Sequence, residues 1–272
     1  MIERLGVVDW GIGGFGVVRA LRRVAPHVPI AYLADSGATP YGLLSQTELI
    51  VRLATVFAEL ERRGVRTVVV ACNAASCAIS QQGPAAAQRL PLAYCSMVDA
   101  AVAQVAADFS GTLGVIGGAR TIRSGVYRRR LLAPGRRIVQ RIAQPLSAHV
   151  EAGTGGSVGC AAALDKILAP LRGAQALLLA CTHYPALSSH IAERLPGTAL
   201  LDPADSVIEH LLQSHTLPRS VAPDCVMTTG SAQDTRHAAI QAWGFDPGPC
   251  ERITLARHGP LPEQTVFGER AG

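Results

Sequence analysis

Two cysteines follow short apolar runs in the same way. Residues 68–71 (VVVA) precede Cys72, and residues 177–180 (LLLA) precede Cys181. A thiol has an ordinary pKa of about 8.5, which falls beside positive charge or a helix N-terminus. Such a group can release and accept a proton near neutral pH. The pair therefore suits a reaction in which one thiol removes a proton and the other returns one.

Inverting a carbon stereocentre by proton transfer requires a group on each face of that carbon. One group must be deprotonated while the other is protonated. Each thiol then needs a partner that sets its protonation, and we expect Asp9 to serve Cys72 and His183 to serve Cys181.

Each cysteine taken alone has a simpler interpretation. A cysteine that ends a buried strand is usually a small apolar residue. The matched pair favours a catalytic role instead. Asn73 and Thr182 directly follow the two cysteines, and their side chains can donate hydrogen bonds to a substrate carboxylate.

Short β-branched runs alternate with longer amphipathic segments, which is typical of an α/β fold. The apolar runs are continuous rather than alternating, as in parallel strands covered by helices on both faces. The predicted strands are residues 5–9, 30–35, 66–72, 113–117, 137–144, 176–181 and 225–230. The clearest predicted helices are residues 13–25, 47–64 and 232–244.

Two short sequence segments each recur later in the chain, at nearly the same interval. Residues 5–8 (LGVV) recur as 113–116 (LGVI), and residues 68–72 recur as 177–181, which are offsets of 108 and 109 residues. The repetition predicts two similar domains, each a mainly parallel sheet flanked by helices, related by pseudo-two-fold symmetry. Each cysteine then ends an equivalent strand, where open α/β sheets bind ligands. We expect the active site between the domains.

The predicted first domain comprises residues 1–97 and 206–272, and the second comprises residues 98–205. The tail is too short for a third domain, so we expect it to return to the first.

Composition narrows the function classes. The chain of 272 residues is 49% hydrophobic, contains a single lysine, Lys166, and carries seven cysteines. A pyridoxal phosphate enzyme needs a Schiff-base lysine, and Lys166 has the setting of a solvent-facing helix residue. We find neither a secretory signal nor an apolar stretch that could span a bilayer. We therefore expect a cytoplasmic protein with reduced thiols and no membrane association.

The main competing interpretation is nucleotide binding. Residues 11–16 (GIGGFG) fit the glycine pattern that follows the first strand of a dinucleotide-binding fold, and Asp35 ends the next strand. An NAD-dependent oxidoreductase is thus an alternative. Against it, Asp9 would lie close to the incoming pyrophosphate, and the repeated cysteine strands would stay unexplained. A substrate carboxylate at the helix start accounts for the same glycines.

Two further alternatives have less support. Cys72, Cys77, Cys181 and His183 include metal-binding residue types, but their spacing does not match a structural zinc site, and we expect no metal. The arginines at 128, 129, 130, 136, 137 and 141 could contact nucleic acid. A solvated helix face explains them better, because Tyr127 is the only aromatic residue nearby, and we expect no nucleic-acid partner.

Several of these residues together resemble the aspartate/glutamate racemase superfamily, and in particular the glutamate racemases of peptidoglycan synthesis. The similarity covers nearly the whole chain. The segments that carry it are Asp9 with residues 11–14, Asp35 with residues 40–42, residues 71–73, and residues 181–185 (CTHYP). Weaker similarities are residues 121–127, residues 145–146 leading to Glu151, and residues 228–230.

The resemblance implies a cofactor-independent amino-acid racemase, with glutamate as the first candidate substrate. It implies Cys72 and Cys181 as the acid/base pair, assisted by Asp9, Glu151 and His183. It also implies substrate contacts from Tyr41, Gly42, Asn73, Thr121 and Thr182. A homodimer is typical of the family, and some members also bind DNA gyrase, which gives a second hypothesis, a catalytically weak gyrase-binding protein.

Three positions depart from the family pattern within the expected substrate pocket. Trp10, Ala74 and Gly118 stand where the family has hydroxyl side chains. Losing a donor to a buried carboxylate costs on the order of 1–3 kcal/mol. A racemase of the same family that acts on a different amino acid is therefore a further hypothesis.

Overall fold

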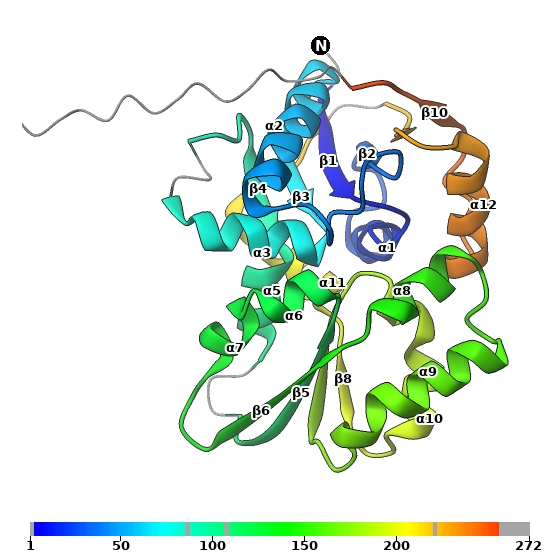
Figure 1. Cartoon of the computed structure of the whole chain (residues 1–272). Coiled ribbons are helices and arrows are strands. Elements are labelled where there is room, and N and C mark those ends of the chain that lie inside the picture. Colours follow the sequence, from blue (N-terminus) through cyan, green and yellow to red (C-terminus); the bar gives the residue numbers. More distant parts are fainter. Residues whose placement is uncertain (1–2, 85–87, 106–108, 220–221, 256–272) are drawn as a thin grey trace, which may run out of the picture.

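The chain forms two separate β-sheets flanked by helices, shown in the upper and lower parts of Figure 1. This computed structural model describes residues 3–84, 88–105, 109–219 and 222–255. Among the helices in those ranges, none is both long and apolar enough to cross a membrane.

The first sheet has six parallel strands in the order β10-β9-β2-β1-β3-β4. Its strands are β1 (Arg4–Asp9), β2 (Ile30–Ala34), β3 (Val65–Val70), β4 (Ala93–Ser96), β9 (Cys225–Thr228) and β10 (Cys250–Arg252). Because β9 and β10 extend its β2 edge, the tail of the chain does return to this sheet, as far as residue 255, the last one described. The predicted tail residues 256–272 lie outside the described part.

The second sheet has four parallel strands in the order β6-β5-β7-β8. Its strands are β5 (Gly111–Gly117), β6 (Arg136–Ile142), β7 (Ala176–Ala180) and β8 (Ala199–Leu201). The prediction of an α/β fold with two parallel sheets is confirmed. The exact domain limits at residues 97 and 205, and the pseudo-two-fold rotation, stay predictions.

The strand order repeats between the sheets. The run β2-β1-β3-β4 has the same connectivity as β6-β5-β7-β8, so β1 corresponds to β5 and β3 to β7. The recurring sequence segments lie on these corresponding strands. Gly6 and Gly114 also match, since a Cβ at either would meet a side chain of the neighbouring strand at 2.8 and 2.9 Å, respectively. The sequence repeat therefore reflects a repeated structure.

Helices cover the first sheet on both faces, which explains its continuous apolar strands. Along β1, Leu5 and Val7 are buried in one apolar cluster, whereas Val8 is buried in another on the opposite face. The helices of this half are α1 (Phe15–Val24), α2 (Gln46–Arg62), α3 (Asn73–Gln82) and α12 (Ala232–Trp243). Helix α2 begins with a capping box between Ser45 and Glu48, which satisfies two backbone N–H groups.

The second sheet is likewise covered by helices. These are α6 (Ala119–Arg123), α7 (Val126–Leu131), α8 (Gln144–Glu151), α9 (Val158–Leu168) and α10 (Ser188–Arg194), with short 3-10 turns η1 (Ala169–Leu171) and η2 (Tyr184–Leu187). Helices α5 (Met97–Gln104) and α11 (Pro203–Ser214) connect the halves.

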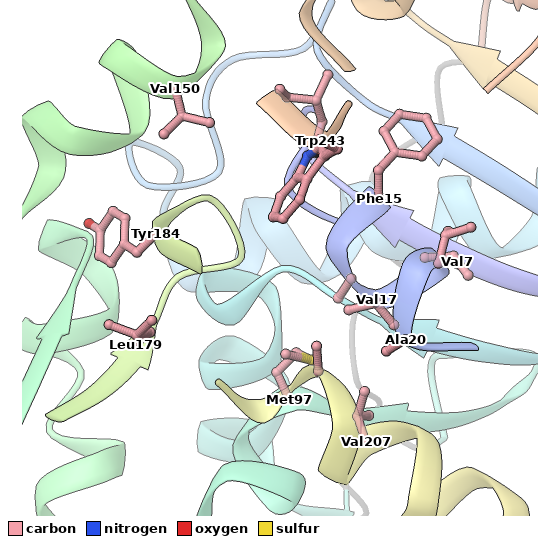
Figure 2. Packing of buried hydrophobic residues seen from close by; sticks show 14 of the residues in the cluster. Val7, Phe15, Val17, Ala20, Met97, Val150, Leu179, Tyr184, Val207 and Trp243 are labelled. Atoms are coloured by element: carbon pink, nitrogen blue, oxygen red, sulfur yellow. Dashed lines mark hydrogen bonds between the residues drawn. The ribbon is translucent and has the colours of Figure 1, made fainter. Parts of the chain in front are cut away.

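One apolar core joins the two halves. Figure 2 shows Phe15 and Trp243 of the first half on one side and Leu179 and Tyr184 of the second on the other, with Met97 between them. All belong to a single cluster of buried side chains. Apolar area removed from water stabilises by roughly 25 cal/mol per Å², so this continuity holds the halves in a fixed relation.

The predicted strands and helices are found at their places in the chain. Three strands were not predicted, namely β4, β8 and β10. Each has only three or four residues, and β8 and β10 contain no buried residue. The arginine prediction was partly wrong. Residues 128–130 lie on helix α7, but residues 136, 137 and 141 lie on edge strand β6 rather than on a helix face.

Candidate active site

A cavity of about 690 Å³ lies where the carboxyl ends of the central strands of both sheets meet. Residues of both halves line it. Every site residue predicted from the sequence is among them: Asp9, Trp10, Tyr41, Gly42, Cys72, Asn73, Ala74, Gly118, Thr121, Glu151, Cys181, Thr182 and His183. The fold thus brings together segments that are up to 174 residues apart in the sequence.

Cys72 lies between strand β3, which ends at Val70, and helix α3, which begins at Asn73. Its extended backbone (φ −71°, ψ 118°) makes it the N-cap of α3. The N–H groups of Ala74 and Ala75 in the first turn of that helix act on the thiol. Burial raises the pKa of the Cys72 thiol, and the charge of Asp9 raises it further. The N–H of Ala75 acts in the opposite direction but does not outweigh them. Cys72 is therefore held as a protonated thiol.

Cys181 directly follows strand β7 and has an ionisable partner of its own. Its Sγ lies 3.7 Å from Nδ1 of His183, and Nε2 of His183 lies 2.5 Å from Oε1 of Glu151. Burial alone would lower the pKa of His183, but its hydrogen bonds to Cys181 and Glu151 outweigh that effect and raise the pKa. Burial likewise opposes the charged form of Glu151, yet the bond to His183 lowers the pKa of its carboxyl. These contacts thus favour the charged form of the imidazole beside the Cys181 sulfur.

Asp9 connects the two halves. Its Oδ1 accepts a hydrogen bond from the backbone N–H of Gly11 (3.0 Å), and its Oδ2 accepts one from the hydroxyl of Thr182 (2.7 Å). The carboxyl is only 1% exposed, and this burial raises its pKa although His183, Gly11 and Thr182 lower it. The Thr182 hydroxyl is therefore engaged with Asp9 rather than free for a substrate carboxylate, which refines the role predicted for it.

The two sulfurs are close enough to interact electrostatically. A negative charge on Cys181 contributes to the raised pKa of Cys72. Like charges disfavour each other at short range. A charge on one sulfur therefore opposes ionisation of the other.

The glycine-rich segment after β1 packs against the second half. A Cβ on Gly11 would collide with the Glu151 carboxylate, and a Cβ on Gly13 would collide with the Thr182 hydroxyl and lie 2.7 Å from Nδ1 of His183. The N–H of Ile12 also donates to Oε1 of Glu151 (3.1 Å). These glycines therefore allow close contact with the partners of Cys181, which explains the pattern without a dinucleotide.

Asn73 presents an unsatisfied donor. Its Oδ1 accepts a hydrogen bond of 2.5 Å from the hydroxyl of Tyr127, but its buried Nδ2 has no hydrogen-bond partner among the described residues. A buried donor without a partner costs about 1–3 kcal/mol. An acceptor group of a bound ligand would satisfy it.

Other predicted substrate residues already have partners. The hydroxyl of Tyr41 donates to Oδ2 of Asp35 (2.9 Å), which also pairs with Arg52. The indole N–H of Trp10 donates to the carbonyl of Ala38 (3.1 Å), so its ring is fixed at the cavity wall. Thr121 is buried in helix α6.

Three polar lining residues were not predicted from the sequence: Arg120, Gln144 and Ser147. The Oε1 of Gln144 accepts a hydrogen bond from the N–H of Ala119 (3.1 Å) and would lie 2.9 Å from a Cβ on Gly118. The Gln144 amide thus occupies space beside Gly118, one of the positions that depart from the family pattern. Position 120 directly precedes Thr121 in the matching segment, and this adjacency was the available signal.

Within the described ranges, no group of three or more His, Cys, Asp or Glu residues is placed to hold a metal ion. The residues considered for a metal, Cys72, Cys77, Cys181 and His183, do not assemble into one site. Cys77 lies inside helix α3 and is fully buried in an apolar cluster. Neither Cys72 nor Cys181 belongs to that cluster.

The chain matches a known protein family over most of its length. Residues 16–211 match the family model described as Asp/Glu/Hydantoin racemase.

Individual relatives and solved structures agree with this match. A glutamate racemase of Deinococcus radiodurans is 38% identical over 213 residues, which cover 76% of this chain and 72% of the relative. A glutamate racemase of Methylococcus capsulatus is 32% identical, with 97% of each chain covered. The crystal structure of Thermus thermophilus glutamate racemase in complex with β-chloro-D-alanine is 28% identical, covers 93% of this chain and 97% of that one, and superposes with a TM-score of 0.81.

Proposed function

The chain belongs to the Asp/Glu/Hydantoin racemase family, and from this premise we propose that it interconverts L- and D-glutamate by proton transfer at Cα. The observation that carries the proposal is the pair of thiols, Cys72 and Cys181, which reach one cavity from corresponding strands of the two sheets. The substrate is a small amino acid, as the cavity size and the named relatives indicate.

The proposed reaction has two steps that use only side chains of this chain. One sulfur, as thiolate, removes the Cα proton and becomes a thiol. The other sulfur, as thiol, then donates its proton to the opposite face of the planar carbanion and becomes a thiolate. The reverse reaction exchanges the two roles. Proton transfer by positioned groups of this kind contributes typically about 10²–10⁴-fold each.

The different surroundings of the sulfurs fit these roles. Cys72 is held as a thiol, whereas Cys181 lies beside the His183 cation. A cation stabilises negative charge on a neighbouring sulfur. In this arrangement Cys72 can act as the proton donor while Cys181 acts as the acceptor, and His183 keeps its bond to Glu151.

The remaining lining residues position the substrate. The unsatisfied Nδ2 of Asn73 would donate to the α-carboxylate. The α-ammonium would lie between the carboxyl groups of Asp9 and Glu151, which line the same cavity. Tyr41 and Gly42 close the cavity from the first half, and Thr121 from the second.

Glutamate is the substrate that the named relatives act on. Because the named relatives are glutamate racemases, a different amino-acid substrate is not favoured despite the departures at Trp10, Ala74 and Gly118. Product D-glutamate would then serve peptidoglycan synthesis. A homodimer and a contact with DNA gyrase stay predictions.

The test is α-proton exchange in deuterium oxide with a panel of L-amino acids, followed by NMR. We expect exchange on glutamate far above all others, accompanied by loss of optical rotation. Faster exchange on another amino acid would replace glutamate as substrate. No exchange on any amino acid, with inhibition of DNA supercoiling instead, would reject the enzymatic proposal.

A further inference from the structure

Arg120 is a cation on the cavity wall that has no carboxylate partner within the described part of the chain. The charged residues lining the cavity are Asp9, Glu151, His183 and Arg120. His183 is paired with Glu151, and Asp9 is hydrogen-bonded to Gly11 and Thr182. Among the described ion pairs, none includes Arg120. An arginine is always protonated, so this charge is uncompensated.

Two N–H groups of Arg120 fix its position across the two halves. Its Nε donates to the carbonyl of Tyr41 (3.0 Å), and its Nη2 donates to the carbonyl of Leu44. Both acceptors belong to the loop between β2 and α2 in the first half, while Arg120 lies in α6 of the second half (Figure 1). A guanidinium has five N–H groups, so three remain, on Nη1 and Nη2, where a carboxylate can bind with both oxygens.

The setting of this cation is partly desolvated and close to the reaction centre. Burial lowers the pKa of Arg120, and its side chain lines the cavity that holds Cys72. Hydrogen bonds to ionised groups in such places are stronger than in water.

Most other side-chain donors of the lining already have partners. The Nε2 of Gln144 donates to the Ser147 hydroxyl, which donates to the carbonyl of Gln144. The hydroxyls of Tyr41 and Thr182 are engaged with Asp35 and Asp9. Residues 10, 74 and 118 carry no hydroxyl. If Asn73 takes the α-carboxylate, the side-chain carboxylate needs another partner, and Arg120 supplies both the charge and the free N–H groups.

We propose that Arg120 binds the side-chain carboxylate of the substrate and thereby selects dicarboxylic over neutral amino acids. The inference rests on the proposed function, because it concerns the same cavity and reaction. It adds a specificity residue that replaces neutral hydroxyl donors by a charge.

The test compares Arg120→Gln and Arg120→Lys with the unmodified enzyme. L-Glutamate and its neutral isostere L-glutamine are measured as substrates, or glutamine as a competitive inhibitor when its turnover is below detection. A charged hydrogen bond is worth enough to change affinity roughly 10- to 100-fold. We expect Arg120→Gln to raise KM for glutamate by about that factor, to change kcat less, and to leave glutamine binding nearly unchanged. Arg120→Lys should lose less than Arg120→Gln.

A purely structural role, holding the loop at Tyr41 and Leu44, would weaken glutamate and glutamine equally and would overturn the inference. A complex structure with D-glutamate gives an independent check that needs no variant. It should show the side-chain carboxylate within 3.2 Å, roughly, of the Arg120 nitrogens; a carboxylate bound elsewhere rejects the role. Glutamate turnover by the unmodified enzyme, measured first, separates this failure from failure of the proposed function.

Discussion

The two halves of the molecule place a thiol at the same point of the same topology but give it different partners. Cys72 follows β3 and Cys181 follows the corresponding strand β7. The first has the N–H groups of helix α3 and the nearby charge of Asp9, whereas the second has the His183–Glu151 pair. A repeated scaffold thus positions both sulfurs at corresponding strand ends, while local side chains make their surroundings unequal.

The inequality is useful because the reaction needs a donor and an acceptor at once. Two identical sites would start in the same protonation state. Here the charge of Asp9 favours the thiol at Cys72, and a cation lies beside Cys181. The glycines after β1 allow this arrangement, since they let Glu151 and His183 of the second half approach the first.

The largest expected effect is a loss of racemase activity when the cavity cysteine of either half is replaced, and the loss should be equal for the two halves. Cys72→Ala or Cys181→Ala removes one of the two proton carriers, and each should lower glutamate racemisation by roughly 10³-fold or more. Cys225→Ala is the matched control, since Cys225 is also half-buried but lies in β9, outside the cavity lining. Racemisation is followed by circular dichroism. A cavity cysteine whose removal costs no more than the control is not an acid/base group.

Weakening only the Cys181 side should have the next largest effect. Glu151→Gln removes the carboxylate that helps to raise the pKa of His183, and we expect about a 10²-fold loss of kcat. The exposed pair His190–Glu193 provides the control variant Glu193→Gln, which should leave kcat unchanged.

The loss of stability in Glu151→Gln should depend on pH in a defined direction. The folded pKa of His183 is raised and that of Glu151 is lowered, so their pair stabilises fully between about pH 4.5 and 6.5, the ordinary values. That contribution is lost as the pH rises through the raised His183 pKa, or falls through the lowered Glu151 pKa. The difference in unfolding free energy between unmodified protein and Glu151→Gln, from urea titrations, should therefore be larger at pH 6 than at pH 9. An increase toward pH 9 would contradict the assignment.

Filling the space between the halves at Gly13 should lower the rate somewhat less than Glu151→Gln does. In Gly13→Ala the new Cβ displaces Thr182 and His183. A displacement of about 1 Å at a reacting group can cost up to roughly 10²-fold in rate. Gly159→Ala is the control, because its Cβ would meet only ordinary contacts, 3.6 Å from His149. Near-normal kinetics of Gly13→Ala would show that this close contact does not position the Cys181 partners.

The smallest effect probes the Cys72 side alone. Asp9→Asn removes a negative charge that raises the pKa of Cys72, so its thiolate fraction at pH 8 should increase. We expect roughly a few-fold faster alkylation of Cys72 by iodoacetamide, measured by peptide mass spectrometry, with Cys250 as internal reference. Slower alkylation would mean that Asp9 does not favour the thiol.

The sequence predicted the central strands well because their apolar runs are buried on both faces. Three of the edge strands, β4, β8 and β10, were not predicted because each has only three or four residues, and β10 (Cys250–Arg252) is also largely exposed. The predicted site residues follow strand ends or lie in matching motifs, so they could be named before the fold was known. Arg120 and Gln144 were missed, since their side chains meet the cavity only once the α6 and α8 segments lie against the first half.

The account depends most on two groups acting from opposite faces of Cα, and the early-time position of deuterium tests this directly. The enzyme is incubated with L-glutamate in deuterium oxide, and the reaction is stopped when less than roughly a tenth of the substrate has reacted. Both enantiomers are then separated by chiral chromatography and analysed by mass spectrometry. The account predicts that D-glutamate carries one deuterium at Cα while the remaining L-glutamate is almost unlabelled. Equal labelling of both enantiomers, or D-glutamate that keeps the original proton, would instead indicate a single base and contradict the two-thiol mechanism.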